Sequence, residues 1–153
     1  GGFRRVDQIA DLIMSNPYLA VVAYFSVGVL ALIVFLYIFE CVTRYDRWKE
    51  IGKGNLAVAM ATGGKIFGIC NVFRFSIQAG DTIYETLIWA GVGFVLLLAA
   101  YFMFEFMTPL FRIDDEIARD NRAVGFLAMI ISVSISYLVG AVIDIMGSGR
   151  PQG

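Results

Sequence analysis

The sequence contains no histidine, and this absence removes the commonest general base and metal ligand of proteins. It also has few charged residues, 16% in all, whereas about a quarter of a soluble domain is charged. The two cysteines, Cys41 and Cys70, are too few for a disulfide framework, and we expect both to be free thiols. These absences disfavour haem, chlorophyll-type and zinc chemistry, so we expect no cofactor and no bound metal.

Hydrophobic residues are in excess, making up 59% of the 153 residues, and the mean hydropathy is +0.75. The formal net charge is −1, so the chain lacks the basic footprint of a nucleic-acid-binding protein. The first long apolar run continues past the length of a signal peptide, and we expect no removable signal. The composition indicates a protein whose main partner is the lipid bilayer.

Four apolar runs are each long enough to cross about 30 Å of hydrocarbon as a helix that rises about 1.5 Å per residue. They cover residues 17–39, 56–79, 82–106 and 123–143. Lipid offers no partners for backbone N–H and C=O groups, so each run must be helical. The alternating pattern of a membrane β-barrel is absent. The sequence therefore predicts an all-α integral membrane fold with four transmembrane helices.

Residues 1–16 have the pattern of a short amphipathic helix that lies in the membrane interface. Apolar residues recur there at helical spacing, at Phe3, Val6, Ile9, Ala10 and Ile13. Ser15 or Asn16 is placed to cap the next helix, which Pro17 then opens. The alternative interpretation is a soluble, partly disordered segment that leads into the first span.

The distribution of Lys and Arg between the connecting segments predicts the orientation in the membrane. Loops 40–55 and 107–122 lie on one side and together hold seven basic residues, whereas the opposite side holds three. Both loops are therefore expected to be cytoplasmic, with both termini outside. Arg4 and Arg5 oppose this orientation because they precede the first span.

The two basic loops resemble each other in sequence. "EIGKGNLAVA" starts at Glu50, and "EIARDNRAVG" starts at Glu116, 66 residues later. Each motif stands at the entry of an even-numbered span, which predicts two tandem copies of a two-helix hairpin. The copies cover 17–79 and 82–144, both inserted the same way up, and 145–153 forms a flexible tail.

This repeated motif resembles the YjfL-like bacterial inner-membrane family, domain of unknown function 350. The resemblance covers roughly residues 20–143, and its strongest marks are residues 55–59 and 121–125. It implies a small four-span inner-membrane protein with a link to envelope stress of the phage-shock type. It brings no catalytic residues with it.

Asn55 and Asn121 each lie one turn before a span, where free backbone N–H groups need partners. An asparagine at this position caps the helix, and Glu50 or Glu116 adds a carboxylate one turn earlier. The functional alternative is an ion or lipid-headgroup site built from these four residues around a pseudo-twofold axis.

The second and fourth spans each carry a stripe of small residues. The first stripe contains Ala57, Ala61, Gly64, Gly68 and Asn71, and the second contains Gly125, Ala128, Ser132, Ser136 and Gly140. Small residues spaced in this way let two helix backbones approach closely in lipid. We therefore expect the two spans to form the tight centre of the protein, with Asn71 adding a hydrogen-bonding group.

Two charged residues lie near the outer end of this hairpin. Arg74 is five residues from the end of its span, close enough to extend its side chain to the interface. Glu85 lies at a similar depth across the short turn. We expect Arg74 and Glu85 to form an interfacial ion pair.

Lys65 lies ten residues past Asn55, about 15 Å deep, where a lone cation costs about 2.5–3.5 kcal/mol. Glu40 and Glu105 sit nearer the cytoplasmic edge. The partner of Lys65 could be another subunit, water or an anionic lipid. Three interpretations remain open: a polar contact between subunits, a residue lining an ion or proton pathway, and a misplaced span boundary.

An enzyme is the weakest functional class, because the sequence has no convincing pair of nucleophile and base. The acidic run 114–116 reads as a solvated charge cluster. We expect a non-enzymatic membrane protein that forms homo-oligomers or serves as a scaffold or accessory for other membrane or cytoplasmic proteins. The alternative is an oligomeric ion or proton channel, or a small transporter, that uses Lys65.

Overall fold

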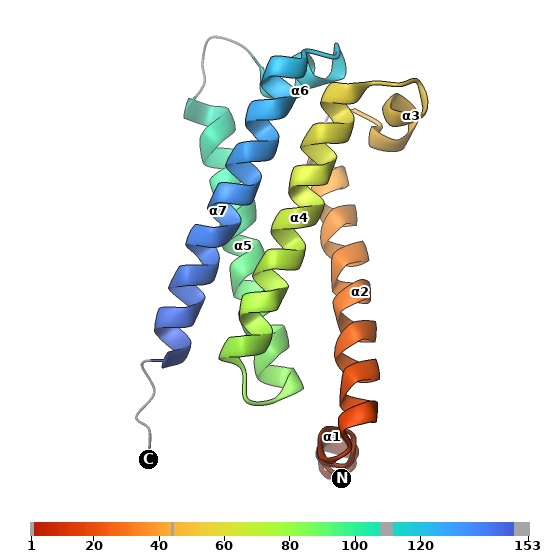
Figure 1. Ribbon diagram of the computed structural model, residues 1–153, viewed down its shortest axis with the longest axis vertical. Coiled ribbons are helices and arrows are strands. Elements are labelled where there is room, and N and C mark those ends of the chain that lie inside the picture. The colour runs from red at the N-terminus through yellow and green to blue at the C-terminus, as the bar shows by residue number, and fades with distance from the viewer. Residues whose placement is uncertain (1, 44, 108–111, 149–153) are drawn as a thin grey trace.

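The computed structural model of the chain describes residues 2–43, 45–107 and 112–148, without the side chains at 105–107 and 148. Figure 1 shows a bundle of long helices with short helices at its two ends. The long helices are α2 (Pro17–Val42), α4 (Leu56–Ala79), α5 (Ile83–Met107) and α7 (Arg122–Ser148). Each is long and apolar enough to cross a membrane, which confirms the prediction of four helical spans.

The predicted boundaries hold for α4, whereas α2 and α7 extend beyond theirs. Helix α2 continues past Phe39 to Val42, and α7 continues past Ile143 to Ser148. The predicted flexible tail at 145–153 is therefore helical over its first four residues, because the apolar pattern continues through Ile145 and Met146. Residues 149–153 lie outside the described part of the chain.

Helix α4 occupies the centre of the bundle, with α2 on one side, α7 on the other and α5 behind (Figure 1). Because α4 and α7 both start at the same end, they run in the same direction. The short helices α3 (Arg47–Gly52) and α6 (Ile113–Ala118) lie at this end, which we call the loop end. Helix α1 (Gly2–Ser15) lies at the opposite end, the α1 end.

Helices α4 and α7 are in backbone contact. A Cβ atom added to Gly64 would stand 2.7 Å from the Cα of Met129, and one added to Gly125 would stand 2.7 Å from the Cα of Ala57. No side chain fits at either glycine without moving a backbone. Small residues thus set the separation of the two helices, as close packing in lipid requires.

Apolar clusters fix the remaining long helices to this pair. Phe39, Ile69, Phe94 and Leu97 are buried together and join α2, α4 and α5. Phe39 is the one buried residue of α2, all of which is described, and it lies near the loop end. Helix α2 is therefore held mainly at the loop end.

Helix α1 is seen nearly end-on in Figure 1, whereas α2 runs along the length of the bundle. The chain turns between them at Asn16, whose side-chain oxygen accepts a hydrogen bond from the amide of Tyr18 at 3.0 Å. Pro17 occupies the first helical position, where its missing N–H costs nothing. The sharp change of direction thus follows from a capping residue and a proline.

The sequence predicts loops over 40–55 and 107–122, and each holds a short helix. Asp46 begins α3 by accepting a hydrogen bond from the amide of Lys49 at 3.3 Å. In α6, Ile113 and Ile117 are buried against Ala57 and other small residues at the start of α4. The loop end is therefore a packed part of the fold.

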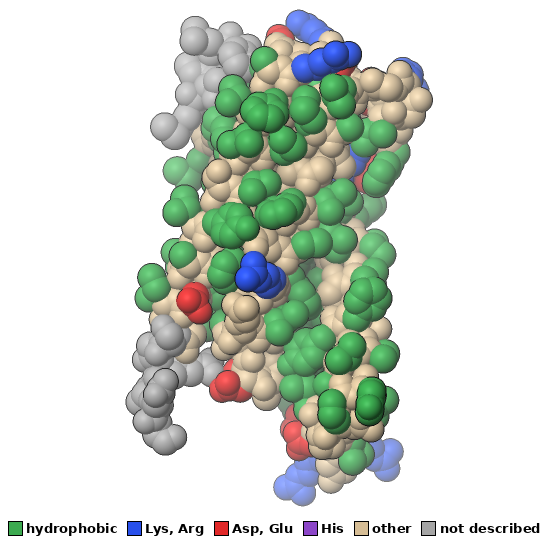
Figure 2. Space-filling view, in the orientation of Figure 1, with side chains coloured by type: hydrophobic (Ala, Val, Ile, Leu, Met, Phe, Trp, Pro, Cys, Tyr) green, Lys and Arg blue, Asp and Glu red, His purple; other side chains and the backbone are tan. Residues whose placement is uncertain are grey.

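The surface of the bundle differs between its flank and its two ends. In Figure 2, hydrophobic side chains spread over the flank of the bundle, and most Lys and Arg side chains gather at the loop end and over α1. Cys41 and Cys70 are exposed free thiols. This distribution is typical of a protein that faces lipid along its sides and water at its ends.

Candidate functional site: the loop end of the bundle

The two loops repeat one hydrogen-bond pattern at an offset of 66 residues. The Asn55 amide donates to the Glu50 carbonyl at 3.0 Å, and the Asn55 side chain donates to the Glu50 carboxylate at 3.4 Å. Asn121 makes the same two bonds with Glu116, at 3.0 and 2.9 Å. The same residue types at the same spacing thus give the same local structure twice.

The same two asparagines also begin α4 and α7. The amide of Val58 donates to Asn55 Oδ1 at 3.0 Å, and the amide of Val124 donates to Asn121 Oδ1 at 3.4 Å. Each bond satisfies one of the backbone donors that a helix leaves free at its start.

The carboxylates of the motif are engaged within their own loops. Glu50 lies 3.6 Å from the Lys53 ammonium, and Glu116 lies 3.7 Å from the Arg119 guanidinium. Each therefore has a cation and an asparagine amide as local partners. These contacts are those of a capped turn, and within the described residues they include no partner common to both carboxylates.

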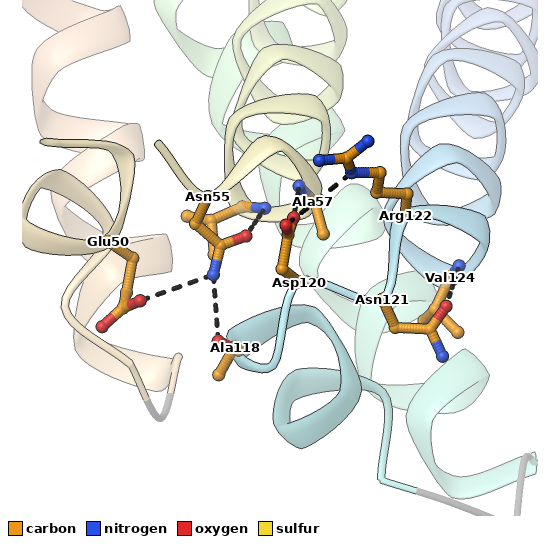
Figure 3. A network of polar contacts seen from close by, with 9 residues as sticks. Glu50, Asn55, Ala57, Ala118, Asp120, Asn121, Arg122 and Val124 are labelled. Carbon is orange, nitrogen blue, oxygen red and sulfur yellow. Dashed lines mark hydrogen bonds and ion pairs between the residues drawn. The ribbon is translucent and has the colours of Figure 1, made fainter. Parts of the chain in front are cut away.

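Two hydrogen bonds cross from one loop to the other, and we call this pair the loop latch. The Asn55 side chain donates to the Ala118 carbonyl at 2.9 Å, and the Ala57 amide donates to Asp120 Oδ1 at 3.0 Å (Figure 3). The latch is asymmetric, because the position equivalent to Asp120 in the first loop is Gly54, which has no side chain. Both residues have positive φ, +62° at Asp120 and +87° at Gly54.

The predicted packing stripes lie at or near the contact of α4 and α7. Asn71 donates to the Ser136 hydroxyl at 3.1 Å in a buried position. Gly68 faces the Ser132 carbonyl, and Gly140 accommodates the Phe75 ring. Buried stripe residues are Ala57, Ala61, Gly64, Gly68, Asn71, Gly125, Ser136 and Gly140, and Ala128 and Ser132 are half-buried.

Lys65 lies inside the bundle, with 5% of its surface exposed. Its Nζ is 4.9 Å from the ring centre of Tyr101 and 5.6 Å from that of Phe39, so two aromatic faces surround the cation. The interpretation of Lys65 as a contact between subunits is therefore wrong, because α4 is central and turns this side chain inward. Sequence spacing gives the depth of a side chain, whereas the packing of neighbouring helices gives its direction.

Tyr101 connects Lys65 to a buried carboxylate on α6. The Tyr101 hydroxyl donates to Asp114 Oδ1 at 2.7 Å. Asp114 is 2% exposed, and its Oδ2 has no hydrogen-bond partner within the described residues. The interpretation of 114–116 as a solvated charge cluster is thus wrong for Asp114, because α6 packs into the bundle.

A cavity of about 30 Å³ adjoins this group, enough for a buried water. Lys65, Tyr101 and Ser132 are its polar lining residues, and the others are apolar side chains of α2, α4, α5, α6 and α7. The loop end therefore encloses a small space in which a cation, a phenol and a hydroxyl meet.

Arg47 on α3 is fully buried beside the same group. Its Nη1 donates to the Leu36 carbonyl at 3.3 Å, and Nε and Nη2 have no hydrogen-bond partner in the described part of the chain. Desolvation lowers the pKa of Arg47, and the nearby Tyr45, Glu40 and Tyr101 oppose this shift. A guanidinium nevertheless stays charged at neutral pH. A buried cation is thus fixed at the end of α2.

The predicted ion pair of Arg74 and Glu85 is not formed. The Arg74 guanidinium lies 5.6 Å from the ring centre of Phe75, and Glu85 accepts a hydrogen bond from the Asp81 amide at 2.8 Å. The Glu85 amide donates to Thr82 Oγ1 at 3.2 Å, close to the pattern of a capping box. The prediction is wrong because the turn before α5 holds Glu85.

The family model described as Domain of Unknown Function (DUF350) matches residues 11–143. The chain belongs to the DUF350 family. This match confirms the resemblance indicated by the repeated loop motif.

Curated relatives of this DUF350 protein are membrane proteins by name. The chain is 56% identical over 126 residues to the UPF0719 transmembrane protein YshE of Bacillus subtilis (strain 168), covering 82% of this chain and 94% of that protein. It is 27% identical over 110 residues to the UPF0719 inner membrane protein YjfL of Escherichia coli (strain K12), covering 72% and 82%. No solved structure matches the chain.

The DUF350 match includes both loops, and the loop end contains polar residues whose contacts inside the bundle the sequence alone did not predict. These are Arg47, Tyr101 and Asp114. The sequence did hold a signal for the burial of Arg47, because the equivalent position in the second repeat is the apolar residue Ile113. No periodic signal marked Asp114, since α6 is only six residues long.

Proposed function

We propose that this DUF350 protein is a non-enzymatic, multi-pass inner-membrane subunit that associates with copies of itself. It would serve as a scaffold or accessory for other membrane or cytoplasmic proteins. One observation carries the proposal: Arg74 and Asp144 are exposed on the flank of candidate membrane spans. A charge facing hydrocarbon costs about 2.5–3.5 kcal/mol at the centre of a span on insertion scales and less toward its ends. Contact with another protein at this flank removes that cost.

The proposed scaffold consists of two tandem two-helix repeats. Glu50 and Asn55 make the same two hydrogen bonds with each other as Glu116 and Asn121 do. This repetition supports the proposal. The parallel course of α4 and α7 supports it as well, because a repeat unit that crosses twice inserts each copy the same way up. The loop latch then joins the two copies at one end.

We further propose that both loops face the cytoplasm and that α1 lies in the opposite membrane interface. The count of Lys and Arg supports the orientation, and the E. coli relative is named an inner membrane protein. The abrupt turn at Asn16 supports the interfacial position, because α1 then runs across the direction of α2. Exposed basic residues of the loops would face cytoplasmic partners.

Native mass spectrometry of the protein in mild detergent and in lipid discs tests the proposal. A homo-oligomer of defined size, alone or with other subunits, is the expected result. A monomer in both media, at concentrations above about 10 μM, would overturn it. Detergent alone is insufficient because it can dissociate helices that lipid holds together.

Conduction is the second candidate function, and the group of Lys65, Tyr101 and Asp114 favours it. Ionisable residues inside a membrane span often mark ion or proton pathways. Here a buried cation contacts a phenol, which in turn donates to a buried carboxylate. The nearby cavity of about 30 Å³ suits water or a proton better than a larger solute.

Liposome flux measurements separate the two functions. If the protein conducts protons, Lys65→Met should change the rate of pH equilibration while the oligomer stays intact. Tyr101→Phe tests the next member of the group, because it keeps an aromatic ring near Lys65 and removes the donor to Asp114. Equal flux from wild type, both variants and empty liposomes would leave assembly as the function.

A further inference from the structure

We propose that the flank formed by α4 and α7 is the interface with a second copy of this chain, with Arg74 of each copy facing Asp144 of the other. The inference rests on the proposed self-association and names its surface. The two copies would be related by a twofold axis along the membrane normal, which keeps both inserted the same way up.

The position of the two charges follows from an aromatic contact on this flank. The rings of Phe67 on α4 and Tyr137 on α7 lie 6.4 Å apart between their centres. Arg74 follows Phe67 by seven residues, and Asp144 follows Tyr137 by seven, which is close to two helical turns in each case. Because α4 and α7 run in the same direction, both charges lie on the same flank and toward the α1 end.

The depths of the two charges match. Arg74 is five residues before the end of α4 at Ala79, and Asp144 is four residues before the end of α7 at Ser148. At 1.5 Å per residue these separations are about 7.5 Å and about 6 Å. A twofold axis along the membrane normal preserves depth, so it brings each arginine to the level of the partner copy's aspartate.

Within one copy the two charges are not paired with each other. The structure has no ion pair of Arg74 or Asp144 with any other described residue, and both side chains are exposed. Figure 2 shows this flank, with basic and acidic side chains among hydrophobic ones over α4 and α7. One positive and one negative charge on a single surface make that surface self-complementary under a twofold axis.

Instead of pairing with a charge on the second copy, a charged side chain can extend to water at the membrane interface. Arg74 is long enough for this, whereas Asp144 is poorly suited to it. A long arginine side chain can carry its charge to the interface, whereas the aspartate side chain has a single methylene group. A carboxylate about 6 Å from the helix end therefore benefits from a cation at its own depth. The second copy supplies that cation.

The exposed face of α4 also permits close approach. Gly63, Phe67, Cys70 and Arg74 follow one another at helical spacing and are all exposed. A Cβ atom added to Gly63 would meet nothing within 4 Å in this copy, unlike Gly64 beside it. Two helices pack closely in lipid where such a small residue lies at their contact.

Disulfide crosslinking in native membranes tests the contact directly. In a background of Cys41→Ser and Cys70→Ser, one tagged copy carries Arg74→Cys and a second, differently tagged copy carries Asp144→Cys. In the mixed dimer one Arg–Asp pair is replaced by the two cysteines and the other pair is kept. Oxidation should give a disulfide-linked product that carries both tags.

The matched control replaces Arg74→Cys with Val21→Cys, an exposed position on α2. The proposal predicts at least about tenfold more mixed crosslink from the Arg74 position than from this control, a factor that corresponds to about 1.4 kcal/mol. Equal crosslinking from the two positions would overturn it. Reduction should remove the product in every case.

Charge exchange provides a second test that needs no crosslink. Arg74→Asp and Asp144→Arg should each lower the dimer fraction in lipid discs, measured by native mass spectrometry, because like charges then meet. The double variant should restore it. A double variant that dissociates as much as the single ones would overturn the interface. A wild-type oligomer without the crosslink would refute this interface alone, whereas a wild-type monomer would refute self-association itself.

Discussion

The loop before α4 and the loop before α7 have the same backbone and different interiors. In both, a glutamate and an asparagine five residues apart close the turn, and a residue with positive φ precedes the asparagine. The first position of the short helix is buried in both, as Arg47 in one loop and Ile113 in the other. The turn thus depends on a few polar residues, whereas the buried position accommodates very different side chains.

The difference between the loops is also a difference in what each can hold. Arg47 donates to the Leu36 carbonyl and lies near Glu40. These two partners offset part of the cost of burying its charge. Ile113 packs on Ala57 and neighbouring small residues of α4. At this position one loop therefore brings a cation into the bundle, and the other contributes an apolar side chain.

The largest expected effect comes from giving the second loop the residue of the first. Ile113→Arg should destabilise the protein by about 3–5 kcal/mol, because a charge would be buried where Ile113 now packs among apolar side chains. Thermal unfolding in detergent, followed by tryptophan fluorescence, measures the loss. Ile113→Leu is the control and should cost less than about 1.5 kcal/mol. An Arg variant as stable as the Leu variant would show that the two buried positions are interchangeable.

Removing the two capping asparagines should show which loop joins the repeats. Asn55→Ala should cost about 2 kcal/mol, since it loses the cap on α4 and leaves the Ala118 carbonyl without its donor. Asn121→Ala should cost about 1 kcal/mol, because it loses the cap on α7 and its bond to Glu116, both within the second repeat. Unfolding by SDS in mixed micelles compares the variants. Equal losses would mean that the latch bond adds nothing.

Asp120 tests the other half of the latch. Asp120→Ala should cost about 1–1.5 kcal/mol, since the Ala57 amide loses its acceptor and alanine is disfavoured at positive φ. Asp120→Asn keeps a side-chain oxygen and tolerates this backbone, so its loss should be smaller. The same SDS titration applies. An asparagine variant that is as unstable as the alanine variant would indicate that the negative charge, and not the hydrogen bond, holds the latch.

The sequence predicted those features that depend on residue type and spacing along one helix. Hydropathy and length gave the four spans, and the ends of α4 follow from Asn55 and a following turn. The surroundings of Lys65 were out of reach, because Tyr101 lies in another span and only tertiary packing sets the rotation of the two helices. The burial of Asp114 was missed for a related reason: a six-residue helix is too short to show a periodic apolar face.

Substitutions of Gly54 should change the free energy of unfolding least. They also compare the two loops directly, at the position where one has glycine and the other aspartate. Gly54 occupies the position of Asp120, has φ of +87°, and faces open space. Gly54→Asn should cost about 0.5 kcal/mol, because asparagine adopts positive φ readily, whereas Gly54→Ala should cost about 1 kcal/mol. Thermal unfolding measures both. If Gly54→Asn were instead stabilising, the first loop could form the reciprocal bond to the start of α7, and the asymmetry of the latch would result from the glycine alone.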